Sequence, residues 1–224
     1  MRAPTSSPDR LASTRPLICL ITDRRAFRPP PEVAAWEEQL LAISAAAQSG
    51  CQLIQIREKD LAAGALASHA REAIEAAAAF GALVLVNDRL DVALAVGAAG
   101  VHLPASSLSV AEARALAGRA GRDDFLIGAS VHSLSEARAA EGADLLICGP
   151  VYETPSKRAY GPPLGLARLA EICAAVEVPV LAIGGLRRDN FRAALEAGAA
   201  GLAAITLFTD LATIRETVRA LRAG

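Results

Sequence analysis

The chain has 224 residues, of which 53% are hydrophobic and 21% are charged. This is the composition of a folded globular protein with a large core, and it excludes an intrinsically disordered chain. The formal net charge is −1 at pH 7, so the sequence gives no electrostatic basis for binding nucleic acid or an anionic membrane surface. Any site for a phosphorylated ligand must therefore be built locally.

Residues 1–16 and the cysteines indicate the cellular compartment in which the protein works. Residues 1–16 contain no apolar stretch of the kind that a secretory signal needs, and we expect them to form a flexible leader. No apolar run reaches the roughly 18 residues that span a bilayer. The cysteines show no metal-binding spacing, which favours reduced core thiols in a cytoplasmic protein. They are Cys19, Cys51, Cys148 and Cys173.

Eight short apolar runs recur along the chain, and longer alanine-rich stretches separate them. The runs are almost continuously hydrophobic, which is typical of a parallel sheet covered by helices. We therefore expect eight strands, at residues 17–23, 53–58, 82–88, 100–103, 126–130, 144–149, 179–185 and 201–208.

The stretches between these runs carry apolar residues at three- and four-residue spacing, which predicts amphipathic helices. Three helix-to-strand joints (VGAAGV, EGADLL and AGAAGL) share a glycine that we expect to adopt a left-handed conformation at the helix end. Eight strands with one repeated joint predict an α/β fold, a single (β/α)8 TIM barrel over residues 17–224. An open doubly wound sheet is the alternative, but its usual GxGxxG turn does not follow the first strand. The predicted helices are 36–48, 64–79, 109–119, 134–141, 164–176, 189–197 and 210–222, with a shorter one within 89–99.

The second predicted strand carries three polar residues at alternate positions. In a barrel of this kind the active site lies at the carboxyl ends of the strands. A period of two places Gln55, Arg57 and Lys59 on one side of the strand. Polar groups that face into a barrel are costly unless they have partners. Two cations beside an amide suit a phosphate or diphosphate together with a hydrogen-bonding ring.

Further candidates lie at the ends of the third, fourth and fifth predicted strands. Asn87 could bind a ligand ring, and Asp88 could either hold Mg²⁺ or cap the next helix. Ser130 ends the fifth strand. His132 follows it, where an unperturbed pKa of about 6.5 suits proton transfer. His102 lies inside the fourth strand and is either a core histidine or a site residue.

The last three strands end in loops that suit an anion. The loop at 149–165 carries Thr154, Ser156 and Lys157, and its glycines and prolines are typical of a lid over an anionic substrate. In many barrels the last two loops bind phosphate through backbone N–H groups, which glycine allows to approach closely. The phosphate-binding candidates there are Gly184, Gly185, Ile205 and Thr206.

Several stretches taken together resemble the thiamine phosphate synthase/TenI family, over about residues 17–210. The stretches that carry the resemblance are LITD, QIREK, VNDRLDVALAVGAAGVHL, IGASVHSLSEA, GPVYETPSK with the following PLG, and AIGGL. The resemblance implies a (β/α)8 barrel, a thiazole phosphate ligand and a role in thiamine biosynthesis.

One branch of the family is thiamine phosphate synthase, which joins hydroxymethylpyrimidine diphosphate to thiazole phosphate and releases diphosphate. Its pattern implies Mg²⁺ held by two aspartates, one of which matches Asp88. The loop that supplies the other typically reads HLGQxD, but here it reads HLPASS. Ala105 takes the glutamine position and Ser107 takes the aspartate position. One carboxylate with substrate phosphates weakens a magnesium site without excluding it.

The other branch resembles TenI, a thiazole tautomerase that isomerises a thiazole carboxylate phosphate to its aromatic tautomer. That reaction needs a proton carrier and a phosphate site but no metal. The uncharged HLPASS loop and the segment ASVHSLSEA resemble this branch, in which the matching proton carrier is His132. We therefore expect a thiazole tautomerase without a cofactor.

Thiamine phosphate synthase, with Mg²⁺, is the alternative, because the chain keeps a synthase-like set for diphosphate and pyrimidine. A non-catalytic ligand binder or regulator on the same barrel is a lesser alternative. The expected partners are a phosphorylated thiazole and, for a synthase, a pyrimidine diphosphate; a homodimer stays open, and nucleic acid and membrane are not expected. The synthase-like set is Gln55, Arg57, Lys59, Asn87, Asp88, Ser130, Thr154, Ser156 and Lys157.

Overall fold

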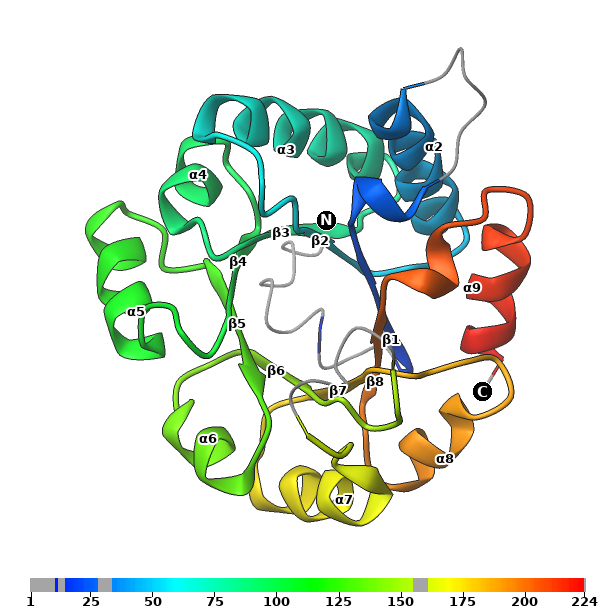
Figure 1. The fold of residues 1–224 in the computed structure, drawn as a ribbon. Coiled ribbons are helices and arrows are strands. Elements are labelled where there is room, and N and C mark those ends of the chain that lie inside the picture. The colour runs from blue at the N-terminus through cyan, green and yellow to red at the C-terminus, as the bar shows by residue number, and fades with distance from the viewer. Residues whose placement is uncertain (1–10, 12–14, 28–33, 155–160, 224) are drawn as a thin grey trace, which may run out of the picture.

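The computed structural model describes residues 11, 15–27, 34–154 and 161–223. Eight parallel strands pair in chain order, and the last pairs with the first to close a barrel (Figure 1). This confirms the predicted (β/α)8 barrel and shows that the open-sheet alternative is wrong. The strands are β1 (Leu17–Ile21), β2 (Leu53–Ile56), β3 (Leu83–Asn87), β4 (Gly100–Leu103), β5 (Leu126–Val131), β6 (Leu145–Cys148), β7 (Val180–Ile183) and β8 (Gly201–Ala204).

Helices follow the strands and surround the barrel, as Figure 1 shows. Gly97, Gly142 and Gly198 stand at the three repeated joints with φ of 70°, 84° and 96°, which confirms the left-handed helix ends. The helices are α2 (Ala35–Gln48), α3 (Ala63–Ala78), α4 (Leu90–Ala95), α5 (Val110–Arg119), α6 (Leu134–Ala139), α7 (Gly165–Ala175), α8 (Phe191–Glu196) and α9 (Ile214–Arg222), with 3-10 turns η1 (Arg24–Ala26) and η3 (Thr206–Phe208).

Several elements are shorter than their sequence patterns predict. Helix α9 begins at Ile214 and not at residue 210, because the Asp210 carboxylate accepts hydrogen bonds from the Ala212 N–H and the Thr213 hydroxyl. These bonds form a turn that competes with the helix. Six of the predicted strands are likewise too long at their carboxyl ends, whereas β4 ends where it was predicted and β5 extends one residue further, to Val131.

The strand side chains alternate between two hydrophobic cores. Leu17, Cys19 and Ile21 of β1 point into the barrel with their counterparts on the other strands. Ile18 and Leu20 point outward into the layer between strands and helices. Within the described part of the chain, no helix has the length and hydrophobicity to cross a membrane.

Leu11 belongs to the inner core although it lies in the predicted leader. It is 2% exposed and joins the cluster that Leu17 and Leu53 form inside the barrel. Its neighbours 1–10 and 12–14 lie outside the described residues. Part of the leader therefore contributes to the core of the barrel.

Leu11→Ala tests this contribution, with Leu41→Ala as its matched control. Leu11 loses a buried side chain, so the free energy of unfolding should fall by about 3 kcal/mol. Leu41 is 56% exposed on α2, and its substitution should change that energy by about 0.5 kcal/mol or less. Urea denaturation of both variants measures the two values. Equal effects would show that Leu11 contributes nothing to the core.

Candidate active site

Four polar side chains lie on the inner face of neighbouring strands at the carboxyl end of the barrel. Gln55 of β2 donates its Nε2–H to Oδ1 of Asn87 on β3, at 2.9 Å. On the next two strands, Nε2 of His102 lies 2.8 Å from Oγ of Ser130. The structure thus brings together the predicted residues Gln55, Asn87 and Ser130, and it adds His102. We call these four residues the inner polar layer.

Two atoms of the inner polar layer are buried without a hydrogen-bond partner in the described structure: Oε1 of Gln55 and Nδ1 of His102. A buried polar atom that lacks a partner costs about 1–3 kcal/mol. A ligand that presents an N–H to Oε1 of Gln55 would remove one of these costs. The layer is therefore prepared to recognise a ring with a hydrogen-bond donor.

The prediction that Gln55, Arg57 and Lys59 share one side of a strand is wrong for Lys59. Strand β2 ends at Ile56, and the Arg57 N–H donates to Oγ1 of the buried Thr22 at 2.8 Å. Arg57 is half-buried, whereas Lys59 is exposed in the turn that follows.

A buried carboxylate explains why the chain turns away from the strand there. Glu58 is 4% exposed and accepts hydrogen bonds from the backbone N–H and Nη1 of Arg24, the latter at 2.9 Å. Its own carbonyl accepts from the Leu61 N–H, which closes the turn. The acid between two predicted site cations therefore anchors η1 to the loop after β2.

Asp88 follows β3 in an unusual backbone conformation. Its φ of 66° is the one positive value among the described residues that are not glycine, and such a conformation costs about 1 kcal/mol or more. Its N–H donates to the His102 carbonyl at 2.8 Å. Helix α4 has Arg89 as its N-cap, without a side-chain bond, so the helix-capping alternative for Asp88 is wrong. The exposed carboxylate makes no hydrogen bond to another described side chain.

The uncharged turn at 104–107 connects β4 to α5. The Ser107 N–H donates to the Pro104 carbonyl, and α5 then begins with a capping box in which Ser109 and Glu112 bond reciprocally. The carboxylate of Glu112 is thus occupied at the helix end. Among the residues that the structure describes, no group of three acidic, histidine or cysteine side chains is placed to hold a metal. With Asp88 as its one carboxylate, this rim offers Mg²⁺ fewer charged ligands than the two aspartates of the synthase pattern.

His132 is oriented by an acid one helical turn later. Oε2 of Glu136 accepts from Nδ1 of His132 at 3.0 Å and from its backbone N–H at 2.7 Å. A carboxylate can only accept, so Nδ1 carries the proton and Nε2 keeps its lone pair in neutral His132. This is the geometry of a group that can accept a proton.

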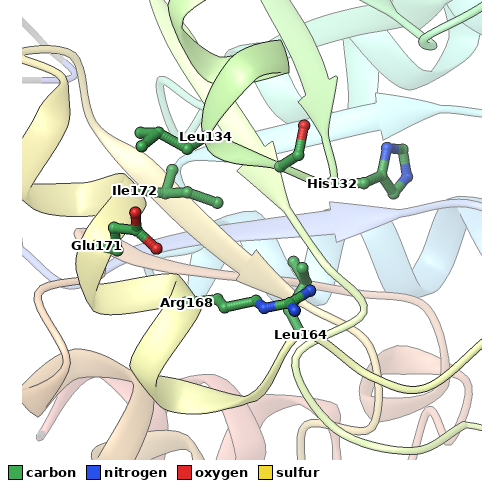
Figure 2. Close-up of a pocket in the computed structure, with 7 residues that line it drawn as sticks. His132, Leu134, Leu164, Arg168, Glu171 and Ile172 are labelled. Atoms are coloured by element: carbon green, nitrogen blue, oxygen red, sulfur yellow. The ribbon is translucent and has the colours of Figure 1, made fainter.

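A cavity of about 160 Å³ lies between α6 and α7 next to His132. Its walls include Leu134, Leu164 and Ile172, with the charged Arg168 and Glu171. Figure 2 shows the His132 ring pointing away from Leu134 and Ile172. None of the four residues of the inner polar layer lines this cavity.

Gly184 and Gly185 follow β7 with φ of 94° and 64°. A Cβ at Gly184 would lie 2.6 Å from the Pro150 side chain, and one at Gly185 would lie 2.6 Å from the Glu153 carbonyl. Glycine thus allows the loops after β6 and β7 to pack closely. Among the described loop and turn bonds between backbone groups, none has the N–H of Gly184, Gly185, Ile205 or Thr206 as its donor.

Ser156 and Lys157, two predicted residues of the loop after β6, lie outside the described residues. Thr154 is described and half-buried at the edge of that gap. All four cysteines are free thiols, and three of them are buried in the described structure.

Sequence reasoning missed two acids, Glu58 and Glu136, and left His102 undecided. The Ser-x-x-Glu pattern from Ser133 to Glu136 was a readable signal, because it predicts a helix start at which the glutamate turns back toward the residues before the helix. The pairing of Glu58 with Arg24 had no such signal, since the two residues are far apart in the chain.

His102 should make the stability of the fold depend on pH. Burial, with a smaller contribution from Arg57, lowers its pKa from 6.5 to about 4. Between these values the unfolded chain binds a proton that the folded chain does not, so stability falls as the pH falls from 6.5 to 4. The loss amounts to about 3 kcal/mol.

Denaturant unfolding at pH 7, 5.5 and 4 checks this, with His102→Gln as the comparison. Carboxylate contributions are common to both proteins and cancel in the difference between them. Parallel stability curves for the two proteins would contradict the prediction.

Gly185→Ala should destabilise the protein more than Gly97→Ala. Gly97 has a similar φ of 70° but has no neighbour within 4 Å of an added Cβ, so it measures backbone strain alone, about 1 kcal/mol. At Gly185 the added Cβ also meets the Glu153 carbonyl and Tyr152. Chemical denaturation should give a loss at least about twice as large. Equal losses would show that the loop after β6 shifts freely.

Comparison with known proteins gives a consistent result. The family model described as thiamine monophosphate synthase (TMP-TENI) matches residues 18–208. The chain is 46% identical over 179 residues to the thiamine-phosphate synthase of Methanoculleus marisnigri, covering 79% of this chain and 83% of the relative. It is 36% identical over 219 residues to the thiamine-phosphate synthase of Roseiflexus castenholzii, covering 96% and 91%.

Solved structures agree with these matches. The thiamine phosphate pyrophosphorylase from Pyrococcus furiosus superposes with a TM-score of 0.78 at 33% identity, covering 93% of this chain and 94% of that one. A 3-hexulose-6-phosphate synthase gives a TM-score of 0.67 at 17% identity, which shows the shared fold alone. The names of the relatives support the synthase alternative better than the tautomerase expectation. The chain belongs to the thiamine monophosphate synthase (TMP-TENI) family and is an enzyme of thiamine biosynthesis.

Proposed function

We propose that the chain is a thiamine-phosphate synthase, which joins hydroxymethylpyrimidine diphosphate to thiazole phosphate. The observation that carries the proposal is the inner polar layer, where Gln55 is bonded to Asn87 and still has an unpartnered Oε1. An aminopyrimidine supplies the N–H donor that this oxygen lacks. The relatives that carry the synthase name support the same conclusion.

The reaction breaks the bond between the pyrimidine methylene carbon and a diphosphate oxygen, which keeps the electron pair. The thiazole nitrogen then gives its lone pair to the methylene carbon and forms the new C–N bond. Catalysis requires that the charge on the departing diphosphate be stabilised. In this proposal Arg57 and Lys59 supply positive charge from the loop after β2, and Lys157 is the expected cation of the loop after β6.

The thiazole phosphate would bind at the opposite side of the mouth. The N–H groups at Gly184, Gly185, Ile205 and Thr206 form a backbone site for its phosphate. Holding both substrates in this way aligns the attacking nitrogen with the methylene carbon, which lowers the entropic part of the barrier. Because the protein supplies one carboxylate, Asp88, the proposal assigns charge neutralisation to the cationic side chains.

Thiazole tautomerase is the second candidate. It is favoured by the pairing of His132 with Glu136, which leaves Nε2 able to accept a proton. The uncharged turn at 104–107 also agrees with a reaction that releases no diphosphate.

Two assays on purified protein separate the candidates. One supplies pyrimidine diphosphate, thiazole phosphate and Mg²⁺ and measures thiamine phosphate; the other follows aromatisation of the thiazole carboxylate phosphate. We expect product in the first assay, a loss of about a hundredfold or more in kcat/KM for Arg57→Ala, and little change for His132→Ala. Turnover in the second assay alone, abolished by His132→Ala, would establish the tautomerase instead.

Ser107→Asp tests the missing carboxylate directly. A second acid in the turn should lower the Mg²⁺ concentration for half-maximal synthase rate by about tenfold, because it adds a nearby opposite charge. Ser106→Asp adds the same charge one residue earlier and is the matched control. If both variants respond equally, the effect is one of general charge, and Ser107 has no special position.

A further inference from the structure

The ring of His102 is held deep in the barrel between two different surroundings. On one side, Nε2 lies 2.8 Å from Oγ of Ser130. On the other side, Nδ1 faces Gly128 of β5, which is paired with His102 in the sheet. A Cβ at Gly128 would lie 2.9 Å from Nδ1 and 3.4 Å from the side chain of Leu145. The missing side chain of Gly128 therefore makes room for the imidazole.

The unequal surroundings select one tautomer of the ring. Among the described residues, Nδ1 has no hydrogen-bond partner. A proton on Nδ1 would make this atom a buried donor without an acceptor. Such a donor is rarer in proteins, and costs more, than a buried lone pair that has no donor. A proton on Nε2 instead donates to Oγ of Ser130 and leaves only a lone pair facing Gly128 and Leu145. The neutral ring is therefore best accommodated with its proton on Nε2.

We propose that His102 is a positioning residue that donates its Nε2–H to Ser130 and so directs the Ser130 hydroxyl proton toward the bound ligand. Because Oγ of Ser130 accepts the hydrogen bond from Nε2–H of His102, the hydroxyl proton of Ser130 remains free to be donated elsewhere. Ser130 then acts as a hydrogen-bond donor to an acceptor atom of the pyrimidine diphosphate. This last identification rests on the proposed synthase function, whereas the tautomer does not.

The tautomer can be measured on the full chain without any substrate. Protein labelled with ¹⁵N at histidine gives ring correlations that distinguish a protonated from an unprotonated nitrogen, and His102→Gln identifies the signals. We expect His102 at neutral pH to carry its proton on Nε2, with Nδ1 unprotonated. A proton on Nδ1 would overturn the proposal, whichever reaction the enzyme catalyses.

Kinetics then test whether His102 acts through Ser130. His102→Leu and Ser130→Ala should each lower kcat/KM for the pyrimidine diphosphate about three- to tenfold, the effect of one hydrogen bond. The double variant should have the same kcat/KM as Ser130→Ala, because His102 affects the ligand only through Ser130. His102→Gln, which can place an amide N–H near Nε2, should recover most of the activity. Losses that multiply in the double variant would overturn the proposal.

Two further variants separate positioning from a general loss of structure. Gly128→Ala pushes on Nδ1 and should reproduce the kinetic effect of His102→Leu. His69→Leu removes a histidine on α3 whose Nδ1 also has no partner among the described residues, and it should leave the kinetics unchanged. If Gly128→Ala keeps wild-type kinetics, the ring position does not matter and the proposal fails. Absence of synthase activity in the wild type would refute the proposed function and leave the tautomer measurement valid.

Discussion

The closure of eight strands into one barrel is the constraint on which the rest of the molecule depends. Closure gives every strand an inner face, and the side chains on it must fill the interior. Near the amino ends of their strands, the side chains of Leu17, Leu53 and Leu126 fill the interior with apolar groups. The same alternation carries Gln55 and His102 inward at the carboxyl ends. Polar groups in that position must bond to each other or to a ligand, so the architecture itself creates the site.

The fold could be predicted from the sequence because its signals are local. A run such as 17–21 is buried on both faces and is therefore apolar throughout, whichever residues surround it. The glycines at 97, 142 and 198 are needed for their own φ values and not for a distant contact. The parallel order then places all carboxyl ends at one rim, so Asn87 and Ser130 could be placed at the site without any knowledge of distances.

The finer contacts of the site could not be predicted, because they depend on pairs that are distant in sequence. His102 and Ser130 are 28 residues apart, and Nε2 reaches Oγ only because the register sets His102 beside Gly128. Glu58 and Arg24 are 34 residues apart, and their bonds turn the chain before Lys59 can continue the alternation. A repeat of polar residues at every second position predicts a strand. It does not indicate at which residue a contact with a distant side chain will end that strand.

The barrel that carries the family fold and the turn that lacks the second aspartate are different parts of the molecule. The barrel and its inner polar layer are fixed by packing, and a change there disturbs several strands. The turn at 104–107 is bounded by β4 and by the capping box at Ser109, which starts α5 independently of the residues before it. A carboxylate can be gained or lost in this turn at little cost to the fold. Under the proposed synthase function, a substitution in these four residues can therefore change the metal ligands while the barrel and its inner polar layer stay as they are.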